Sequence, residues 1–311
     1  MDGPGRRALL VVNGNSRNGG EAKAAIAALE AGGMTLVQRD CESRERLPGV
    51  IRAARHEVDC VVLGGGDGTM NAGAQALRDT GLPLGILPLG TANDLARTLG
   101  LPTSPEEAAA VILAGHTRRI DLGSVNGRPF FNVASVGLTV EITQRLDRAA
   151  KRRLGRLAYP WTALRVLMGH QRFSAVIRCG HDVHRVRTMQ VTVGNGRFYG
   201  GGMVVSEDAA IDDHKLAMYS LEPRSRWSLL WMARAFRAGE HQELQGVRTG
   251  QGTVVELVTR VPRQVSADGE IVTVTPARFG VLPGAVTVFA PAAETPAAEA
   301  PVPEAAGAEE P

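Results

Sequence analysis

Short apolar runs alternate with helical patterns through the first 123 residues of the chain. Each run has the length of a buried strand, and the residues after it space apolar side chains three and four positions apart, as on one helix face. The strand-like runs are 8–12, 34–38, 58–63, 84–88 and 120–123, and the helical patterns are 21–29, 47–56, 69–77, 95–99 and 105–113. This alternation is typical of a mostly parallel sheet covered by helices, so residues 1–123 are expected to form an α/β domain.

The pattern changes after residue 123. A long stretch, 140–168, has largely helical spacing, and a shorter helical pattern covers 224–236. Short alternating stretches typical of strands are 130–134, 175–178, 187–193, 216–221, 253–258, 264–267, 271–275 and 286–289. Many short strands separated by Gly, Pro and Asp indicate an antiparallel β-sandwich or barrel. Residues 124–290 are therefore expected to form a second, mostly β domain.

Composition indicates a globular protein with a polar tail. Hydrophobic residues make up 44% of the chain and charged residues 22%, and no apolar run approaches the ~20 residues of a membrane-spanning helix. Residues 291–311 contain no aromatic residue and should be a disordered Pro/Ala/Glu tail. The N-terminus lacks a signal-peptide pattern, and the three cysteines lack metal-site spacing. A cytoplasmic protein is expected.

The stretch Gly64–Thr69 carries the strongest candidate chemistry. It places four glycines and Asp67 between a buried strand and a helix. Glycine lets the backbone approach a ligand closely, and a helix N-terminus presents free N–H groups to an anion. An ordinary strand-to-helix turn is the alternative. Asp67 favours a ligand site over an ordinary turn, because a carboxylate beside a phosphate needs a divalent cation between the two groups. The pattern suggests a magnesium nucleotide.

Two other polar turns also follow predicted strands. Asn13–Gly20 follows the first strand and offers Asn13 and Ser16 as side-chain donors, although plain helix capping explains it equally well. Gly90–Asp94 follows the fourth strand. Because open α/β sheets bind ligands at the carboxyl ends of their strands, three such turns together favour a nucleotide site.

Several motifs give the chain a resemblance to a known family. They are GGGDGTMN at 64–71, LPLGTANDLA at 87–96, FNVASVG at 131–137, GNG at 194–196, GGG at 200–202 and DGE at 268–270. In this order they resemble the diacylglycerol-kinase catalytic domain family, in its soluble bacterial lipid-kinase branch, which is related to sphingosine and ceramide kinases. The resemblance implies an N-terminal nucleotide domain, a C-terminal β-sandwich and an ATP site in the cleft between them.

The resemblance also implies roles for individual residues. Residues expected at the nucleotide, besides Asn13 and Ser16, are Gly65, Gly66, Asp67, Gly68, Thr69, Met70, Asn71, Ala72 and Thr91. Asp67, Asp94 and Asp121 are expected to form an acidic network around a catalytic magnesium ion. Cys41 stands where the family commonly has a threonine that contacts the nucleotide.

Glu270 occupies the position that the family uses as general base on the lipid hydroxyl. A bare hairpin turn at 268–270 is the alternative interpretation. A second, structural magnesium ion is implied at Asp213, with the carbonyl groups of Ala210 and Lys215. His214 stands where relatives usually have glycine, so this site is expected to differ from theirs.

Two basic stretches are candidates for contact with a membrane. Arginines and Lys151 between residues 145 and 156 precede an apolar, aromatic segment, and 224–237 combines arginines with two tryptophans. Such faces can dock on an anionic bilayer, but a solvated helix face explains the first equally well. Nucleic-acid binding is disfavoured, because only 13 Phe, Trp and Tyr residues occur and they lie among apolar neighbours. A homodimer is left open.

These patterns together predict an ATP- and magnesium-dependent kinase that phosphorylates a hydroxyl of a peripherally contacted membrane lipid. Diacylglycerol, phosphatidylglycerol and sphingoid-like lipids all fit. One rival is a soluble kinase resembling NAD kinases, which share Gly-Gly-Asp-Gly but do not require apolar basic helices. Another is a nucleotide- or membrane-binding module without catalysis, which the presence of Asp67, Asp94, Asp121 and Glu270 disfavours.

Overall fold

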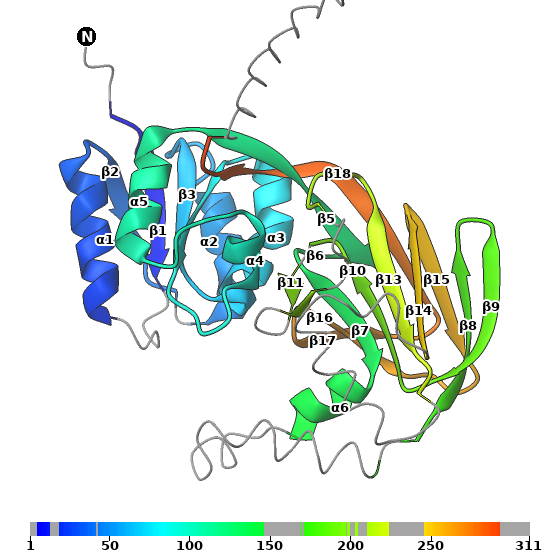
Figure 1. Cartoon of the computed structure of the whole chain (residues 1–311). Helices are drawn as coiled ribbons and strands as arrows, with labels where there is room; N and C mark the ends of the chain where they lie inside the picture. Colours follow the sequence, from blue (N-terminus) through cyan, green and yellow to red (C-terminus); the bar gives the residue numbers. More distant parts are fainter. Residues whose placement is uncertain are drawn as a thin grey trace, which may run out of the picture.

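The computed structural model describes residues 5–12, 19–41, 43–145, 169, 171–196, 198–199, 203–204, 210–223 and 246–292 (Figure 1). Asn13, Ser16, most of the two basic stretches and the C-terminal tail lie outside these residues. Of the long helical pattern at 140–168, the described part is helix α6 (Leu138–Arg145). Among the described helices, none is both long and apolar enough to cross a bilayer.

The N-terminal part is a parallel sheet with helices on both faces. Its strands lie in the order β2 (Thr35–Gln38), β1 (Arg7–Val12), β3 (Cys60–Gly65) and β4 (Leu84–Pro88). Helices α1 (Gly19–Ala31) and α5 (Pro105–Ala114) pack on one face, and α2 (Leu47–Ala53), α3 (Asp67–Thr80) and α4 (Asp94–Thr98) pack on the other. Alternate apolar residues of β1 and β3 serve the two faces, which explains their unbroken apolar runs.

Two long strands extend this sheet toward the rest of the chain. β5 (Thr117–Val125) and β18 (Ala277–Phe289) pair antiparallel, and Val288 of β18 pairs parallel with Leu84 of β4. A bulge between Leu282 and Val286 bends β18, and Gly284 takes a φ of +52° there. Figure 1 shows the pair running from the α/β part into the β part. Strand β18 therefore connects the parallel sheet of the N-terminal part with the strands of the β part.

The C-terminal part is an antiparallel sandwich. One layer continues from β18 through β15 (Val254–Thr259), β8 (Phe173–Cys179) and β9 (Asp182–Thr188), with β6 (Arg128–Phe130) beside β5. The other layer has the order β14 (Val247–Gly252), β13 (Leu216–Leu221), β10 (Gln190–Gly194), β7 (Val133–Gly137), β16 (Gln264–Ala267) and β17 (Glu270–Val274). β11 (Phe198–Tyr199) and β12 (Met203–Val204) form a separate pair. Buried apolar residues of both layers form one core between them.

The predicted fold class is confirmed: a mostly parallel α/β part is followed by an antiparallel β-sandwich. Some strand predictions were incomplete. The stretch predicted as one strand at 187–193 is two strands, because the Thr188 hydroxyl bonds to Leu221 and the chain turns at Met189. The strand β14 was missed because its sequence, VRTGQG, has almost no apolar pattern. The first part of β18 was also missed, because its apolar pattern is interrupted by Gly280, Pro283 and Gly284.

The close contact between β5 and β6 gives a stability test. A Cβ atom on Gly123 would lie 2.2 Å from Cζ of the buried Phe130 ring, so Gly123→Ala is expected to lower the free energy of unfolding by about 1–3 kcal/mol. The matched control is Gly280→Ala on the neighbouring strand, where a Cβ would meet only Ser124 Oγ at 3.5 Å. Its effect should stay within about 0.5 kcal/mol. Equal losses in urea unfolding of the two variants would contradict this packing.

Candidate active site

Two glycine turns touch at the carboxyl ends of β3 and β4. β3 ends at Gly65, Gly66 takes an extended conformation, and α3 begins at Asp67. A Cβ on Gly90 would lie only 2.4 Å from the Cα of Gly66, and one on Gly65 would lie 2.4 Å from Thr69 Oγ1. Only glycine lets these backbones approach so closely. The two turns therefore form one continuous surface of backbone at the end of the sheet.

Asn93 closes the second turn. It adopts a left-handed conformation with φ +52°, and its side chain both accepts from Gly90 N at 3.0 Å and donates to Gly90 O at 3.1 Å. α4 then begins with Asp94, which is only 5% exposed. Thr91, predicted to contact the nucleotide, lies exposed in this turn. The turn is thus fixed by its own asparagine, as turns with positive φ at Asn often are.

Asp67 joins three parts of the structure. Its Oδ1 accepts a hydrogen bond from Leu95 N at the start of α4, at 3.0 Å, and from Asn132 Nδ2 at 3.5 Å. In an ordinary strand-to-helix turn, the alternative for this stretch, an aspartate commonly bonds to its own backbone. The observed partners come instead from another helix and from the segment that enters β7. The carboxylate therefore holds the first glycine turn against both.

Asp268 holds that same segment from the other side. Asp268 is partly buried, and its carboxylate accepts from the backbone N–H groups of Phe131 at 2.8 Å, Asn132 at 3.1 Å and Val133 at 2.9 Å. The pKa of Asp268 is raised to about 7, mainly because burial disfavours the charged form. The charge of Asp67 also raises this pKa, whereas the three backbone hydrogen bonds lower it. The sequence singled out Asp268 only as part of the 268–270 motif, without its contacts to residues 131–133. The signal was present, because Asp before Gly is common where the chain turns with positive φ, here +45°.

Glu270 begins β17 and its side chain is half exposed. Its Oε1 lies 3.8 Å from Nη1 of Arg44, a residue from the short 3₁₀ turn η1 (Arg44–Arg46). The same guanidinium lies on the first turn of α3, because a Cβ on Gly68 would be 2.5 Å from Nη1. Glu270 therefore faces the glycine turn through Arg44, which the sequence gave no reason to select.

The carboxylate of Asp121 has different partners. Asp121 is 1% exposed and accepts from Gly284 N at 2.6 Å and His214 N at 2.8 Å, while His214 Nδ1 lies 2.9 Å from its Oδ1. Within the described chain, no three His, Cys, Asp or Glu side chains lie close enough together to hold a metal ion. The structure thus does not bring Asp67, Asp94 and Asp121 into one metal-binding group, because Asp121 fastens β18 and the 210–215 turn.

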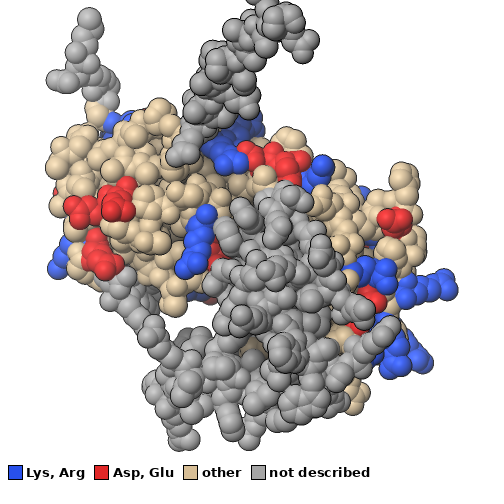
Figure 2. All heavy atoms as spheres, in the orientation of Figure 1, with Lys and Arg blue, Asp and Glu red and all other residues tan. Residues whose placement is uncertain are grey.

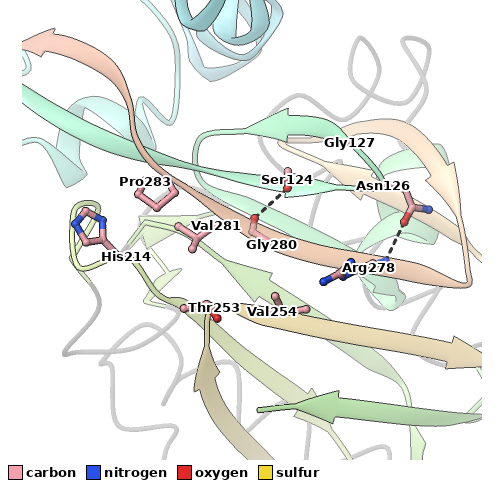
Figure 3. A pocket seen from close by; sticks show the side chains of 10 residues that line it. All are labelled: Ser124, Asn126, Gly127, His214, Thr253, Val254, Arg278, Gly280, Val281 and Pro283. Atoms are coloured by element: carbon pink, nitrogen blue, oxygen red, sulfur yellow. Dashed lines mark hydrogen bonds between the residues drawn. The ribbon is translucent and has the colours of Figure 1, made fainter.

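A pocket of about 540 Å³ lies on the His214 side of this arrangement (Figure 3). The side chains that line it are Ser124, Asn126, Gly127, His214, Thr253, Val254, Arg278, Gly280, Val281 and Pro283. Ser124 Oγ donates to Gly280 O at 3.1 Å, and Arg278 N donates to Asn126 Oδ1 at 2.9 Å. None of these ten residues belongs to either glycine turn, so the pocket is separate from them.

The turn predicted for a structural magnesium ion is closed by its own hydrogen bonds. Asp213 Oδ1 accepts from Lys215 N at 2.8 Å and its Oδ2 accepts from Ala210 N at 3.3 Å. Among the described residues with a buried polar atom that lacks a partner, none belongs to this turn. The structural magnesium ion at Asp213, Ala210 and Lys215 stays a prediction.

Around the glycine turn, by contrast, buried polar atoms do lack hydrogen-bond partners. Buried side-chain oxygens without a hydrogen-bond partner include Thr69 Oγ1, Asn71 Oδ1, Thr98 Oγ1, Asn132 Oδ1 and Asn195 Oδ1. Thr69 and Asn71 belong to the start of α3, and Asn132 also contacts Asp67. Buried polar atoms are almost always paired, so their concentration here fits a missing polar ligand. Mg²⁺ commonly uses one or two carboxylates together with phosphate oxygens, which Asp67 can satisfy.

Cys41 lies just before η1, and its thiol donates to Ser43 O at 2.9 Å.

Comparison with known proteins identifies both halves. Residues 7–125 match the family model of the diacylglycerol kinase catalytic domain, and residues 132–290 match that of the YegS C-terminal NAD kinase beta sandwich-like domain. The resemblance inferred from the motifs is confirmed.

Named relatives and solved structures agree with these matches. A Pseudomonas aeruginosa protein named "Probable lipid kinase YegS-like" is 35% identical over 298 residues, covering 92% of this chain and 95% of the relative. A "Diacylglycerol kinase" of Mycobacterium tuberculosis is 32% identical over 302 residues, covering 92% and 95%. A crystal structure of a diacylglycerol kinase from Bacillus anthracis has the same fold, with a TM-score of 0.72 at 21% identity, covering 93% of this chain and 98% of that one.

The buried carboxylate of Asp268 predicts a pH dependence. Its pKa is about 7 in the folded chain but about 3.9 in an unfolded one, so the folded state holds a proton that the unfolded state has lost. The contribution of Asp268 to stability is therefore greatest below about pH 4 and is lost as the pH rises through about 7. Urea unfolding of wild type and Asp268→Asn at about pH 5 and about pH 7.5 measures this contribution. Wild type should lose stability relative to the variant over that interval, and a constant difference would contradict the assignment.

Proposed function

This chain belongs to the diacylglycerol kinase catalytic domain family and is a kinase, and on that premise we propose that it transfers the terminal phosphate of ATP to a hydroxyl of a membrane lipid. One observation carries the proposal: the backbone contact between the turns after β3 and β4, which Asp67 joins to Asn132. This contact creates a surface of glycine backbone at a helix N-terminus, bordered by a carboxylate. Such a surface suits a nucleotide phosphate chain with its metal ion.

The chain's own groups would bind and orient the phosphates. N–H groups of the first turn of α3 would donate to phosphate oxygens, and the hydroxyl of Thr69, which lacks a partner, would donate as well. Asp67 would hold magnesium. The ion, when bound, neutralises phosphate charge.

Glu270 would act on the acceptor. In the transfer, the lipid hydroxyl oxygen forms a bond to the terminal phosphorus while the bond from that phosphorus to the bridging oxygen of ATP breaks, and ADP leaves. The hydroxyl proton goes to the carboxylate of Glu270. The half-exposed position of Glu270 beside Arg44 supports this role, since the carboxylate is open to an incoming group and close to the glycine turn.

The surface charge supports contact with an anionic membrane. Figure 2 shows Lys and Arg side chains gathered at the end of the β-sandwich. Three exposed arginines lie on one face of the pair formed by β8 and β9: Arg178, Arg185 and Arg187. Each cation near an anionic bilayer contributes roughly 1 kcal/mol of attraction.

A Glu270 variant tests the function. Glu270→Gln keeps the size of the side chain but cannot take the proton, so turnover should fall about 10²–10⁴-fold without loss of ATP affinity. The measurement uses labelled ATP with a panel of extracted lipids and with NAD as a soluble acceptor. Glu256→Gln is the matched control, because Glu256 is another half-exposed strand glutamate that pairs with an arginine, Arg178, at 3.5 Å.

Two outcomes would count against the proposal. Turnover of Glu270→Gln within a few-fold of wild type would place the base elsewhere. Label that appears on NAD while every lipid stays unlabelled would favour the soluble-kinase alternative.

A further inference from the structure

Arg44 occupies an unusual place for a cation. Its guanidinium lies flat on the N-terminal turn of α3: a Cβ on Gly68 would be 2.5 Å from Nη1, 3.0 Å from Cζ and 3.4 Å from Nη2. Any side chain at position 68 would push the guanidinium away. Gly68 therefore serves two purposes, since it leaves backbone accessible and it admits Arg44.

Electrostatics make this position unfavourable without an anion. The N-terminus of a helix carries a partial positive charge, so an arginine there is repelled by the helix dipole. The arginine and the dipole together attract a negative group. Because a guanidinium presents a planar fork of N–H donors, it suits an anion with several oxygens, such as a phosphate.

The ion pair that Arg44 forms with Glu270 is weak. Arg44 Nη1 lies 3.8 Å from Glu270 Oε1, and both side chains are about half exposed, at 52% and 48%. Exposed ion pairs of this kind stabilise proteins little. The pair can therefore separate readily when a stronger anion reaches Arg44.

A second observation points to a ligand at the same turn. Thr69 follows Gly68, is 5% exposed, and its Oγ1 has no hydrogen-bond partner. That oxygen faces the glycine turn, because a Cβ on Gly65 would lie 2.4 Å from it. A buried hydroxyl without a partner and a cation without a strong partner thus lie on one helix turn.

We propose that Arg44 binds the terminal phosphate of ATP and leaves Glu270 when it does so. The inference rests on the proposed function and adds a catalytic residue and an order of events. In the nucleotide-free protein Arg44 neutralises the base. When ATP enters, Arg44 turns to the phosphate that will be transferred, and Glu270 is released to accept the hydroxyl proton. ADP lacks that phosphate, so the Arg44–Glu270 pair persists with ADP bound.

The test compares the affinities of ATP and ADP, each with magnesium, by isothermal titration calorimetry. The variants are Arg44→Ala, Arg44→Lys and, as matched control, Arg46→Ala, because Arg46 is exposed in the same turn. Arg44→Ala should weaken ATP binding about 10- to 100-fold, the range of hydrogen bonds to a charged group, and change ADP binding by less than about 3-fold. Arg44→Lys should lie between, since lysine keeps the charge without the fork. Arg46→Ala should match wild type.

Turnover gives the second readout. Arg44→Ala should reduce phosphoryl transfer about 10²-fold or more, in line with arginines that contact a transferring phosphate. Because the Arg44–Glu270 pair is exposed, the melting temperature should change by less than about 5 °C, which shows that the variant is folded.

The failures are distinguishable. Tight ATP binding in wild type with an unchanged ATP-to-ADP ratio in Arg44→Ala would overturn the inference alone and leave Arg44 as a surface ion pair. Wild-type protein that binds neither nucleotide would overturn the proposed function and the inference with it.

Discussion

The carboxylate of Asp67 is the contact on which the candidate site depends. It accepts from the first backbone N–H of α4 after Asp94 and from the side chain of Asn132, so one residue ties the two glycine turns to the β-sandwich. Asp268 fixes the other end of this connection by taking the three N–H groups of residues 131–133. A charged group that accepts from a buried backbone is costly to remove, because its donors are left without partners. The position of the first glycine turn relative to the β part thus follows from two aspartates.

Charges of both signs lie close together at this turn. Asp67 begins α3, and the guanidinium of Arg44 lies on the same helix turn. A site that must hold a polyanion and its cation, and then release a proton, needs both signs close together. By contrast, Asp121 accepts hydrogen bonds from the 210–215 turn and from β18, so its task is to hold β5 and β18 together where the sheet continues from one part to the other.

Much of this arrangement could be predicted from the sequence, and most of what could not depends on contacts between residues far apart in the chain. The glycine turns and the parallel strands before them are local patterns, and so is the short-strand texture of the second half. Arg44 could not be found in this way, because its importance arises from contact with Gly68 and with Glu270, which lies far along the chain. The surroundings of Asp121 could not be predicted for the same reason, because they include His214, which is distant in the sequence. β14 was missed for a different reason: as an edge strand rich in polar residues and glycine, it lacks the alternation that reveals strands.

Hydrogen–deuterium exchange with and without ATP and magnesium tests the location of the site most directly. If the phosphates lie on the turn after β3, peptides that cover Gly65–Thr69 should exchange more slowly when the nucleotide is bound, because their N–H groups gain partners or become buried. Peptides around the separate pocket, at 278–283, should be unchanged. Slower exchange confined to 278–283, with no change at the glycine turn, would contradict the account.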